Sequence, residues 1–244
     1  MADLCFVLLA ESAYPDADAV IAAASDMGLE LTLTEREGPL GFSMETGGQL
    51  FVMLMPVPHP DVPKMPFGLT APPKDEALAA PAHLIVTALG LVGTPRQKDL
   101  QMAALTACVM EGAKCVGAMF GHGRFFHLAG LFAEMAKLGA ELGELPAEIA
   151  VDVTAAPEPE DRMSFLTHGL ACYGREEFFI SCPVNGRGAL DFVFSMARWM
   201  LDDPDKQLPT GDTLGRSEDE TLLIQRQRNP TGSDDTVIRL DLDG

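Results

Sequence analysis

The sequence lacks the short motifs that mark common catalytic and cofactor sites. No Gly-x-Gly-x-x-Gly stretch lies between an expected strand and an expected helix, so a dinucleotide-binding fold has no support. The stretch Gly112–Gly117 resembles a phosphate-binding loop, but the Lys and Ser or Thr that would hold phosphate and Mg²⁺ do not follow it. A Gly-x-Ser-x-Gly nucleophile elbow and a Cys-x-x-Cys pair are also absent. We therefore expect no cofactor.

Long apolar runs are missing as well. The longest of them, such as Leu84–Val92, reach about half of the roughly 20 residues that a membrane-spanning helix needs. The N-terminus contains an apolar run, residues 4–10, but Asp3 lies where a signal peptide carries Lys or Arg. We interpret these residues as the first strand and expect no membrane association.

Cysteine is sparse, and its pattern does not suggest disulfide bonds. The five cysteines are odd in number and widely spaced: Cys5, Cys108, Cys115, Cys172 and Cys182. A chain of 244 residues can bury a sufficient core without such bonds. A reducing compartment, the cytoplasm, is the expected location.

Positive charge is scarce, because 17 basic residues stand against 36 acidic ones and the net charge is −19. A field of this sign repels phosphate, which disfavours binding to nucleic acids and to anionic membrane surfaces. Two interpretations of the acidity stay open. It can serve solubility alone, or it can attract a basic protein partner.

Residues 1–56 predict a β-α-β-β-β unit similar to a split βαβ motif. Pro15 and Asp16 are typical of a helix start, and Gly28 of a helix end. Leu29–Thr34 alternates between apolar and polar residues, as a strand with one buried face does. The expected strands are 4–10, 29–34, 40–45 and 49–56, with the helix between the first two.

Proline is concentrated in residues 57–81 and at their margin, where regular structure is not expected. The segment is either a connection between two domains or an arm that packs across the surface. Residues 82–244 then form the main α+β unit, unless the whole chain is one continuous domain.

This main unit mixes strands and helices without strict alternation, which favours an α+β fold over a doubly wound one. We predict a mixed, mainly antiparallel sheet with helices packed on one face. Thr94 and Pro95 are typical of a helix start. The expected helices are 95–112, 125–138 and 188–201; the expected strands are 83–89, 114–120, 146–154, 164–173, 176–182, 221–227 and 236–242; and polar loops are expected at 155–162 and 205–219.

The candidate site with the richest chemistry is the segment 121–127. It carries His122, Arg124 and His127 between an expected strand and an expected helix, whose free backbone N–H groups could bind an anion. The two histidines are five residues apart, which does not place them on one helical face and is not a zinc spacing. A tight turn with capping side chains is the alternative interpretation.

Other histidines and cysteines suggest no metal site. His83 and His168 lie in or beside apolar runs and are interpreted as core or edge histidines, since a metal site needs three or four converging ligands. His59 lies among prolines and is expected to be exposed. The cysteines are interpreted as small buried apolar residues.

Three stretches together resemble a known family. They are His83–Leu89, the strand Val116–Phe120 with its Gly-His-Gly turn, and Ser164–Phe178, which contains Thr-x-Gly-Leu-x-x-x-Gly. The pattern is similar to the bacterial domain of unknown function 4261 family (DUF4261) over about the C-terminal two thirds of the chain. The resemblance implies a bacterial cytosolic α+β protein and assigns no catalytic residues.

Three functions follow as alternatives. The first is a non-enzymatic acidic binding protein, such as an immunity or inhibitor protein that covers a basic partner. The second is an enzyme with an unrecognised site near His122, Arg124 and His127. The third is a subunit of an assembly, and the oligomeric state is left open by the sequence.

Overall fold

The computed structural model describes residues 3–186, 188–203, 205–215 and 220–242. The chain divides into two compact units, Met1–Ala150 and Val151–Gly244. Each is described by itself below.

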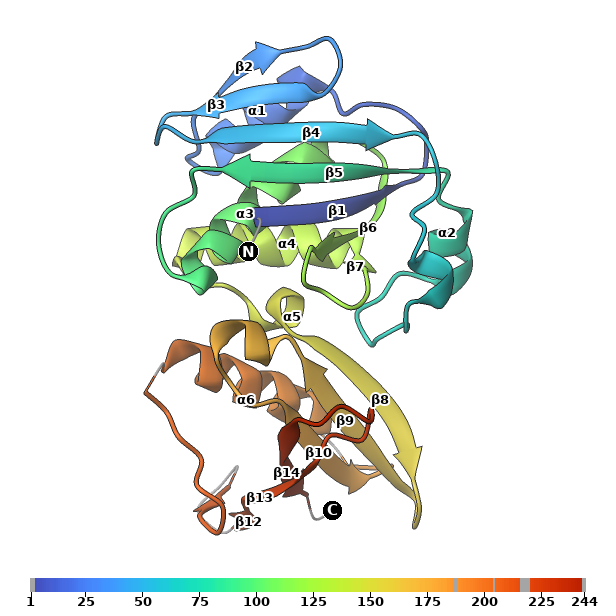
Figure 1. Ribbon diagram of the computed structural model, residues 1–244, viewed down its shortest axis with the longest axis vertical. Coiled ribbons are helices and arrows are strands. Elements are labelled where there is room, and N and C mark those ends of the chain that lie inside the picture. The colour runs from blue at the N-terminus through green and yellow to red at the C-terminus, as the bar shows by residue number, and fades with distance from the viewer. Residues whose placement is uncertain (1–2, 187, 204, 216–219, 243–244) are drawn as a thin grey trace. The chain divides into compact units, whose positions relative to one another are not determined.

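Unit 1 contains a seven-stranded sheet in which every pair of neighbouring strands is antiparallel. The strands follow the order β2-β3-β4-β5-β1-β6-β7 (Figure 1). They are β1 (Asp3–Leu9), β2 (Leu31–Glu35), β3 (Leu40–Met44), β4 (Gln49–Met55), β5 (Ala82–Leu89), β6 (Cys115–Phe120) and β7 (His127–Leu128). Strands β1 and β2 run in the same direction with β3, β4 and β5 between them, as a split arrangement requires. The predicted α+β class and mainly antiparallel sheet are confirmed.

Three helices cover one face of this sheet: α1 (Ala17–Asp26), α3 (Pro95–Glu111) and α4 (Ala129–Leu142) (Figure 1). Helix α3 begins with a capping box, because Thr94 Oγ1 accepts from the N–H of Gln97 and Gln97 Oε1 accepts from the N–H of Thr94. The predicted cap at Thr94 is therefore confirmed. Residues Met102–Met110 are buried on every side of the helix, because α1, α4 and the sheet all pack against α3.

The proline-rich residues 57–81, called the arm from here on, do not separate two domains. Strands β4 and β5 flank the arm and pair directly with each other, so both belong to one sheet. The chain divides at 150/151 instead of within the arm. The boundary predicted at residues 57–81 thus differs from the observed one, because strand pairing joins residues that lie far apart in the sequence.

The arm packs on the other face of the sheet, as the alternative interpretation predicted. Side chains alternate along β1, so Cys5 and Val7 face α3 while Leu8 faces the arm. Val62, Ala77 and Ala80 of the arm form an apolar cluster with residues of the sheet and of the segment after β6, which are Leu8, Val116, Met119 and Phe126. The arm contains a short 3₁₀ helix, Val62–Lys64, and α2 (Lys74–Ala79), although no regular structure was expected there.

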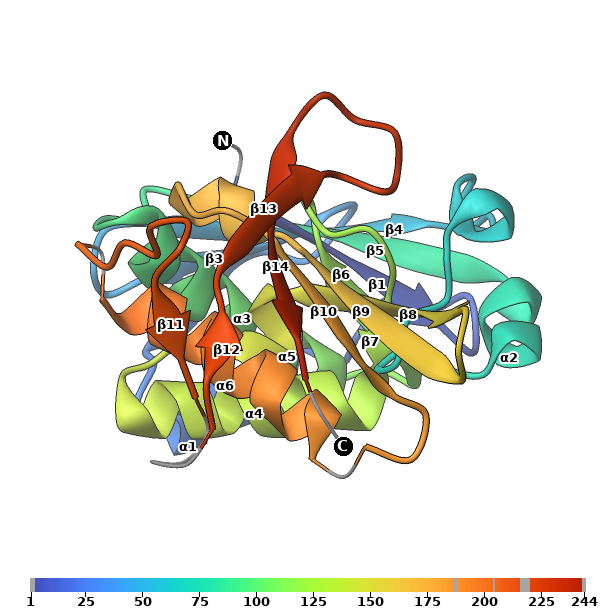
Figure 2. The ribbon, with the colours of Figure 1, turned by 90° about the horizontal axis from the view of Figure 1, so that it is seen from below.

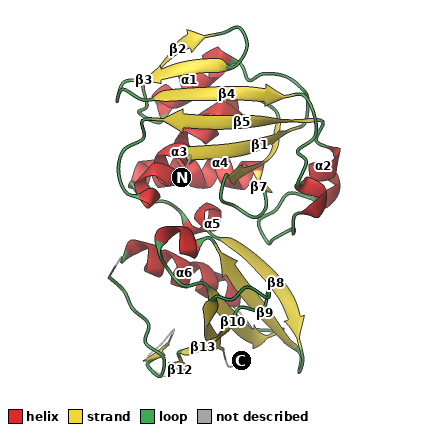
Figure 3. Cartoon of the chain, viewed as in Figure 1, coloured by secondary structure: helices red, strands yellow, loops and turns green. Residues whose placement is uncertain are grey.

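Unit 2 contains a five-stranded sheet in the order β13-β14-β10-β9-β8, with α6 (Ala189–Asp202) packed against it (Figures 2 and 3). Its strands are β8 (Asp152–Glu158), β9 (Arg162–His168), β10 (Phe178–Pro183), β13 (Gln225–Arg228) and β14 (Thr236–Asp241). Only β10 and β14 are parallel among the paired strands described for this sheet. The strands expected at 221–227 and 236–242 correspond in part to β13 and β14, which pair as antiparallel neighbours. A separate two-stranded ribbon joins β11 (Thr213–Leu214) to β12 (Leu222–Leu223).

Several predicted boundaries were wrong. The helix expected at 125–138 begins only at Ala129, because His127 and Leu128 pair with β6. The strand expected at 146–154 starts as the helical turn α5 (Ala147–Ala150), and β8 extends into the acidic stretch expected to be a loop. The strand expected at 164–173 ends at His168, because Gly169 has a φ of 121° and the chain turns into a 3₁₀ helix, Leu170–Tyr173. Residues 216–219 of the polar loop expected at 205–219 lie outside the described residues.

Candidate functional site

The segment 121–127 forms a turn and strand β7 rather than a helix start. The N–H of Gly123 donates to the carbonyl of Phe120, which closes a tight turn after β6. Helix α4 begins two residues after His127. The argument for an anion at the helix start therefore does not apply to His122, because a strand separates this residue from the helix.

His122 faces the first turns of α3. Its ring stacks on Phe120 with centroids 5.4 Å apart and planes 7° apart. Its Nε2 lies 4.0 Å from Oδ2 of Asp99, and both side chains are about 15% exposed. The structure thus places His122 beside a carboxylate, at the rim of the sheet.

His127 is buried and fastens the arm to the sheet. Its Nδ1 lies 2.7 Å from the hydroxyl of Thr70, and the N–H of Leu128 donates to the carbonyl of the same threonine. Arg124, by contrast, is exposed. The contacts of His122 and His127 are thus to different parts of the fold, and the rings of Phe120 and Phe132 lie between them.

The remaining histidines are buried. His83 donates from Nδ1 to the carbonyl of Val57, and His168 lies 3.0 Å from the hydroxyl of Thr154, so the interpretation of both as core histidines is confirmed. His59 was expected to be exposed, but it is only 6% exposed because the arm presses it against the sheet.

The five cysteines, all within the described residues, form no disulfide bonds. Burial raises the pKa of Cys108 and of Cys115 to about 12, and it raises the pKa of the fully buried Cys5 further. A thiol needs to be ionised to act as a nucleophile or metal ligand, so these three are poorly suited to either role at neutral pH.

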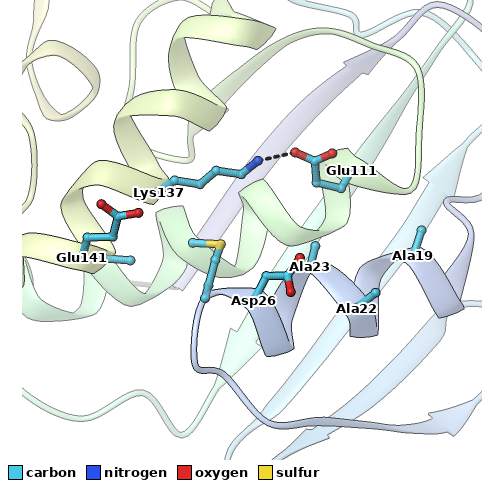
Figure 4. Close-up of a pocket in the computed structure, with 9 residues that line it drawn as sticks. Ala19, Ala22, Ala23, Asp26, Glu111, Lys137 and Glu141 are labelled. Atoms are coloured by element: carbon cyan, nitrogen blue, oxygen red, sulfur yellow. Dashed lines mark hydrogen bonds and ion pairs between the residues drawn. The ribbon is translucent and has the colours of Figure 1, made fainter.

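A groove of about 570 Å³ lies between α1, the end of α3 and α4 (Figure 4). Small side chains form its apolar lining, together with Met27, and they are Ala19, Ala22, Ala23 and Ala140. Asp26, Glu111 and Glu141 supply three carboxylates, and Lys137 the one ammonium group among the lining residues. Lys137 reaches across to Glu111 and forms an ion pair with it. The groove is therefore lined by alanine and has a net charge of −2.

One carboxylate of the groove, that of Asp26, comes from the part of the unit 1 sequence that is richest in negative charge. Residues 1–50 contain nine acidic residues and a single basic one, Arg36. Residues 51–150 contain nine acidic and seven basic residues. Eight of the ten excess negative charges of unit 1 therefore lie in its first 50 residues, which include α1.

Unit 2 has a cavity of about 380 Å³ whose charged residues hold the fold together. Arg226 forms a two-armed ion pair with Glu176, with N–O distances of 2.8 and 2.6 Å. Arg175 donates to three carbonyls at and after the end of α6, which are those of Met200, Asp203 and Lys206. Arg175 and Arg226 thus already bind groups within unit 2.

Within residues 3–186, 188–203, 205–215 and 220–242, no three His, Cys, Asp or Glu side chains are grouped so that they could hold a metal ion. No helix in the same ranges is long and apolar enough to cross a membrane.

Comparison of the chain with protein-family models, curated proteins and solved structures found no match. The resemblance to the DUF4261 family stays a prediction.

Sequence reasoning missed the groove because it assembles from three helices. The signal that could have indicated it is local: five of the ten residues of α1 are alanine, and Asp18 and Asp26 lie near its two ends. That pattern alone does not distinguish a groove wall from a plain solvent-exposed helix.

Proposed function

We propose that this chain is a binding protein whose α1–α4 groove holds a basic segment of a protein partner, as an immunity or inhibitor protein would. The observation that carries the proposal is the groove lined by alanines and by three carboxylates against one lysine. No catalytic step is required of any residue.

The shape of the groove suits long basic side chains. Alanine at positions 19, 22, 23 and 140 leaves room for the aliphatic stems of Lys or Arg to lie against the helices. The charged ends of such side chains then reach Asp26 and Glu141, while Glu111 already holds Lys137. A partner of opposite charge thus gains both apolar contact and ion pairs.

The charge distribution supports the same partner. Complementary fields speed encounter and reject partners of like charge. Helix α1 carries Asp18 and Asp26, and it belongs to the first 50 positions, where nine acidic residues stand against one basic residue. A second copy of this chain is disfavoured as occupant, because it would bring acidic residues against acidic ones.

A lysine- and alanine-based helical peptide tests the proposal directly. A fluorescent peptide of about 18 residues is long enough to form helix in part. We expect it to bind the full chain at low salt and to dissociate as salt rises, because exposed charge pairs are screened. In the double variant Asp26→Lys/Glu141→Lys, the affinity should fall by about tenfold or more, because like charges then face each other.

A matched control keeps the same change in net charge away from the groove. Asp212→Lys/Asp235→Lys changes two exposed carboxylates of unit 2. Equal loss of affinity in both double variants would show that only overall charge matters and would overturn the groove as the site. Self-association that the groove variant abolishes would instead identify a second copy as the occupant.

A further inference from the structure

Three of the five histidines contact the arm. His59 belongs to it, His83 donates to the carbonyl of Val57, and His127 bonds the hydroxyl of Thr70. The arm is poor in backbone donors because it is rich in proline, so side chains fasten it where a strand would use ladder hydrogen bonds.

His59 and His83 form the centre of this attachment. Their ring centroids lie 4.8 Å apart with the planes at 70°. The rings of Phe6 and Phe126 also pack against His59 in T-shaped arrangements, with centroid distances of 5.0 and 5.3 Å. Both histidines are less than 7% exposed. The pair is therefore packed among aromatic rings and shielded from water.

The hydrogen bonds define where the protons lie. The N–H of Asp61 donates to Nδ1 of His59, so that nitrogen carries a lone pair and the ring proton is on Nε2. His83 carries its proton on Nδ1, because the Val57 carbonyl only accepts. A second proton on His59 would have to bind Nδ1, where it would face the N–H of Asp61 and break that hydrogen bond.

The surroundings also oppose a charge on this ring. Burial is the main cause that lowers the pKa of His59, and the neighbouring His83 lowers it further, while the carboxylate of Asp61 acts in the opposite direction. Other elements packed against the pair bring few ionisable groups. Strand β4 brings none, and β5 brings His83 alone.

The remaining charged groups of the packed elements lie at the margins. Strand β1 carries Asp3 at its far end, paired with Ala88 rather than near His83. Strand β6 brings the neutral thiol of Cys115. The other charged side chains of the arm and of the turn after β6 are exposed, and they are Lys64, Lys74, Asp75, Glu76 and Arg124. His127 is hydrogen-bonded through Nδ1 to the hydroxyl of Thr70.

We propose that the arm is a pH-sensitive cover, in which protonation of His59 releases residues 57–81 from the sheet. The uncovered surface would be the apolar cluster of Leu8, Val116, Met119 and Phe126. The device needs only a proton from solvent, and it is independent of the acidic groove on the helical face.

Hydrogen exchange of the full chain tests this. Amide protection in the arm peptides is measured at about pH 7.5 and about pH 5 and corrected for the intrinsic rates. We expect protection of residues 57–81 to fall by about tenfold or more at the lower pH, because His59 is the group that must charge. Peptides of α3, buried under the other face, should keep their protection.

His59→Phe keeps an aromatic ring at this position and removes the group that takes up the proton. The amides of the arm should then be equally protected from exchange at both pH values. His122→Gln is the matched control, because this side chain lies beside Asp99 of α3 and stacks on Phe120, and the variant should respond like the original chain. Equal arm protection at both pH values in the original chain, or an unchanged response in His59→Phe, would overturn the proposal. So would simultaneous loss of protection in α3, which is global unfolding.

If His59→Phe does not fold, the original chain still decides the matter. The ring signals of His59 in NMR spectra must titrate together with the amides of the arm. Arm amides that stay unchanged while His59 titrates contradict the proposal.

Discussion

The two faces of the sheet in unit 1 are covered in different ways. Helices α1, α3 and α4 cover one face, and their backbone groups satisfy one another within each helix. The arm covers part of the other face with little regular structure, and it is fastened by histidine side chains. The first cover depends mainly on apolar packing, whereas the second depends also on the protonation state of the histidines that hold it.

This difference predicts that the helical face carries most of the stability of unit 1. Phe132 of α4 is fully buried against Phe120. In Phe132→Ala, the free energy of unfolding should fall by about 3–5 kcal/mol, because a large cavity remains. Urea denaturation followed by circular dichroism measures it. A loss below about 1 kcal/mol would show that this face is not the main core.

On the arm face, Gly68→Ala should loosen the cover without unfolding the sheet. A Cβ atom at position 68 would lie 1.9 Å from Cζ of Phe125, so either the arm or that ring must move. We expect a loss of about 1–3 kcal/mol, and faster proteolysis within residues 57–81. Gly130→Ala on α4, where a Cβ meets nothing within 4 Å, is the control. Equal proteolysis of the two variants would contradict the packing of the arm.

The free energy of unfolding should depend on pH through the arm face. Since the pKa of His59 is lower in the folded chain than in the unfolded one, the unfolded chain binds more protons between the two values. Stability is therefore complete above about pH 6.5 and is lost as pH falls from there through the folded pKa. One such proton contributes at most about 1.4 kcal/mol per pH unit. Urea denaturation at several pH values measures how the free energy of unfolding changes with pH. His59→Phe should weaken this dependence. A dependence that stays unchanged in the variant would show that other groups cause it.

The smallest effect is expected on the helical face, at the ion pair of Lys137 and Glu111. Both side chains are over 40% exposed, so Lys137→Met should change the free energy of unfolding by only about 0.5 kcal/mol. The same change removes the single cation of the groove lining and should tighten binding of the lysine-based peptide by about threefold. Weaker peptide binding in Lys137→Met would contradict an acidic docking groove.

Local sequence patterns predicted many elements correctly and placed several of their ends wrongly. Thr94 with Gln97 and Pro95 marks the start of α3, because a capping box uses residues within one turn. The start of α4 was missed because His127 and Leu128 find a partner in β6 across a turn. A helical pattern does not show that a neighbouring strand competes for its first residues.

The candidate site illustrates the same limit. His122 and His127 are close in sequence, yet they contact α3 and the arm respectively. The groove residues are distant in sequence, from Ala19 to Glu141, and meet only when three helices pack. Charge composition suggested a basic partner, but it could not say which surface would receive it.

Composition and local pattern by themselves determined the acidity of this protein, its α+β class and the positions of most helices and strands. The acidity follows from composition, and the fold class and the elements follow from periodicity and capping, which act over a few residues. Only the tertiary structure decided that the proline-rich segment is a cover and that His59 is buried beside His83. The reason is that burial and strand pairing are settled between residues far apart in the chain.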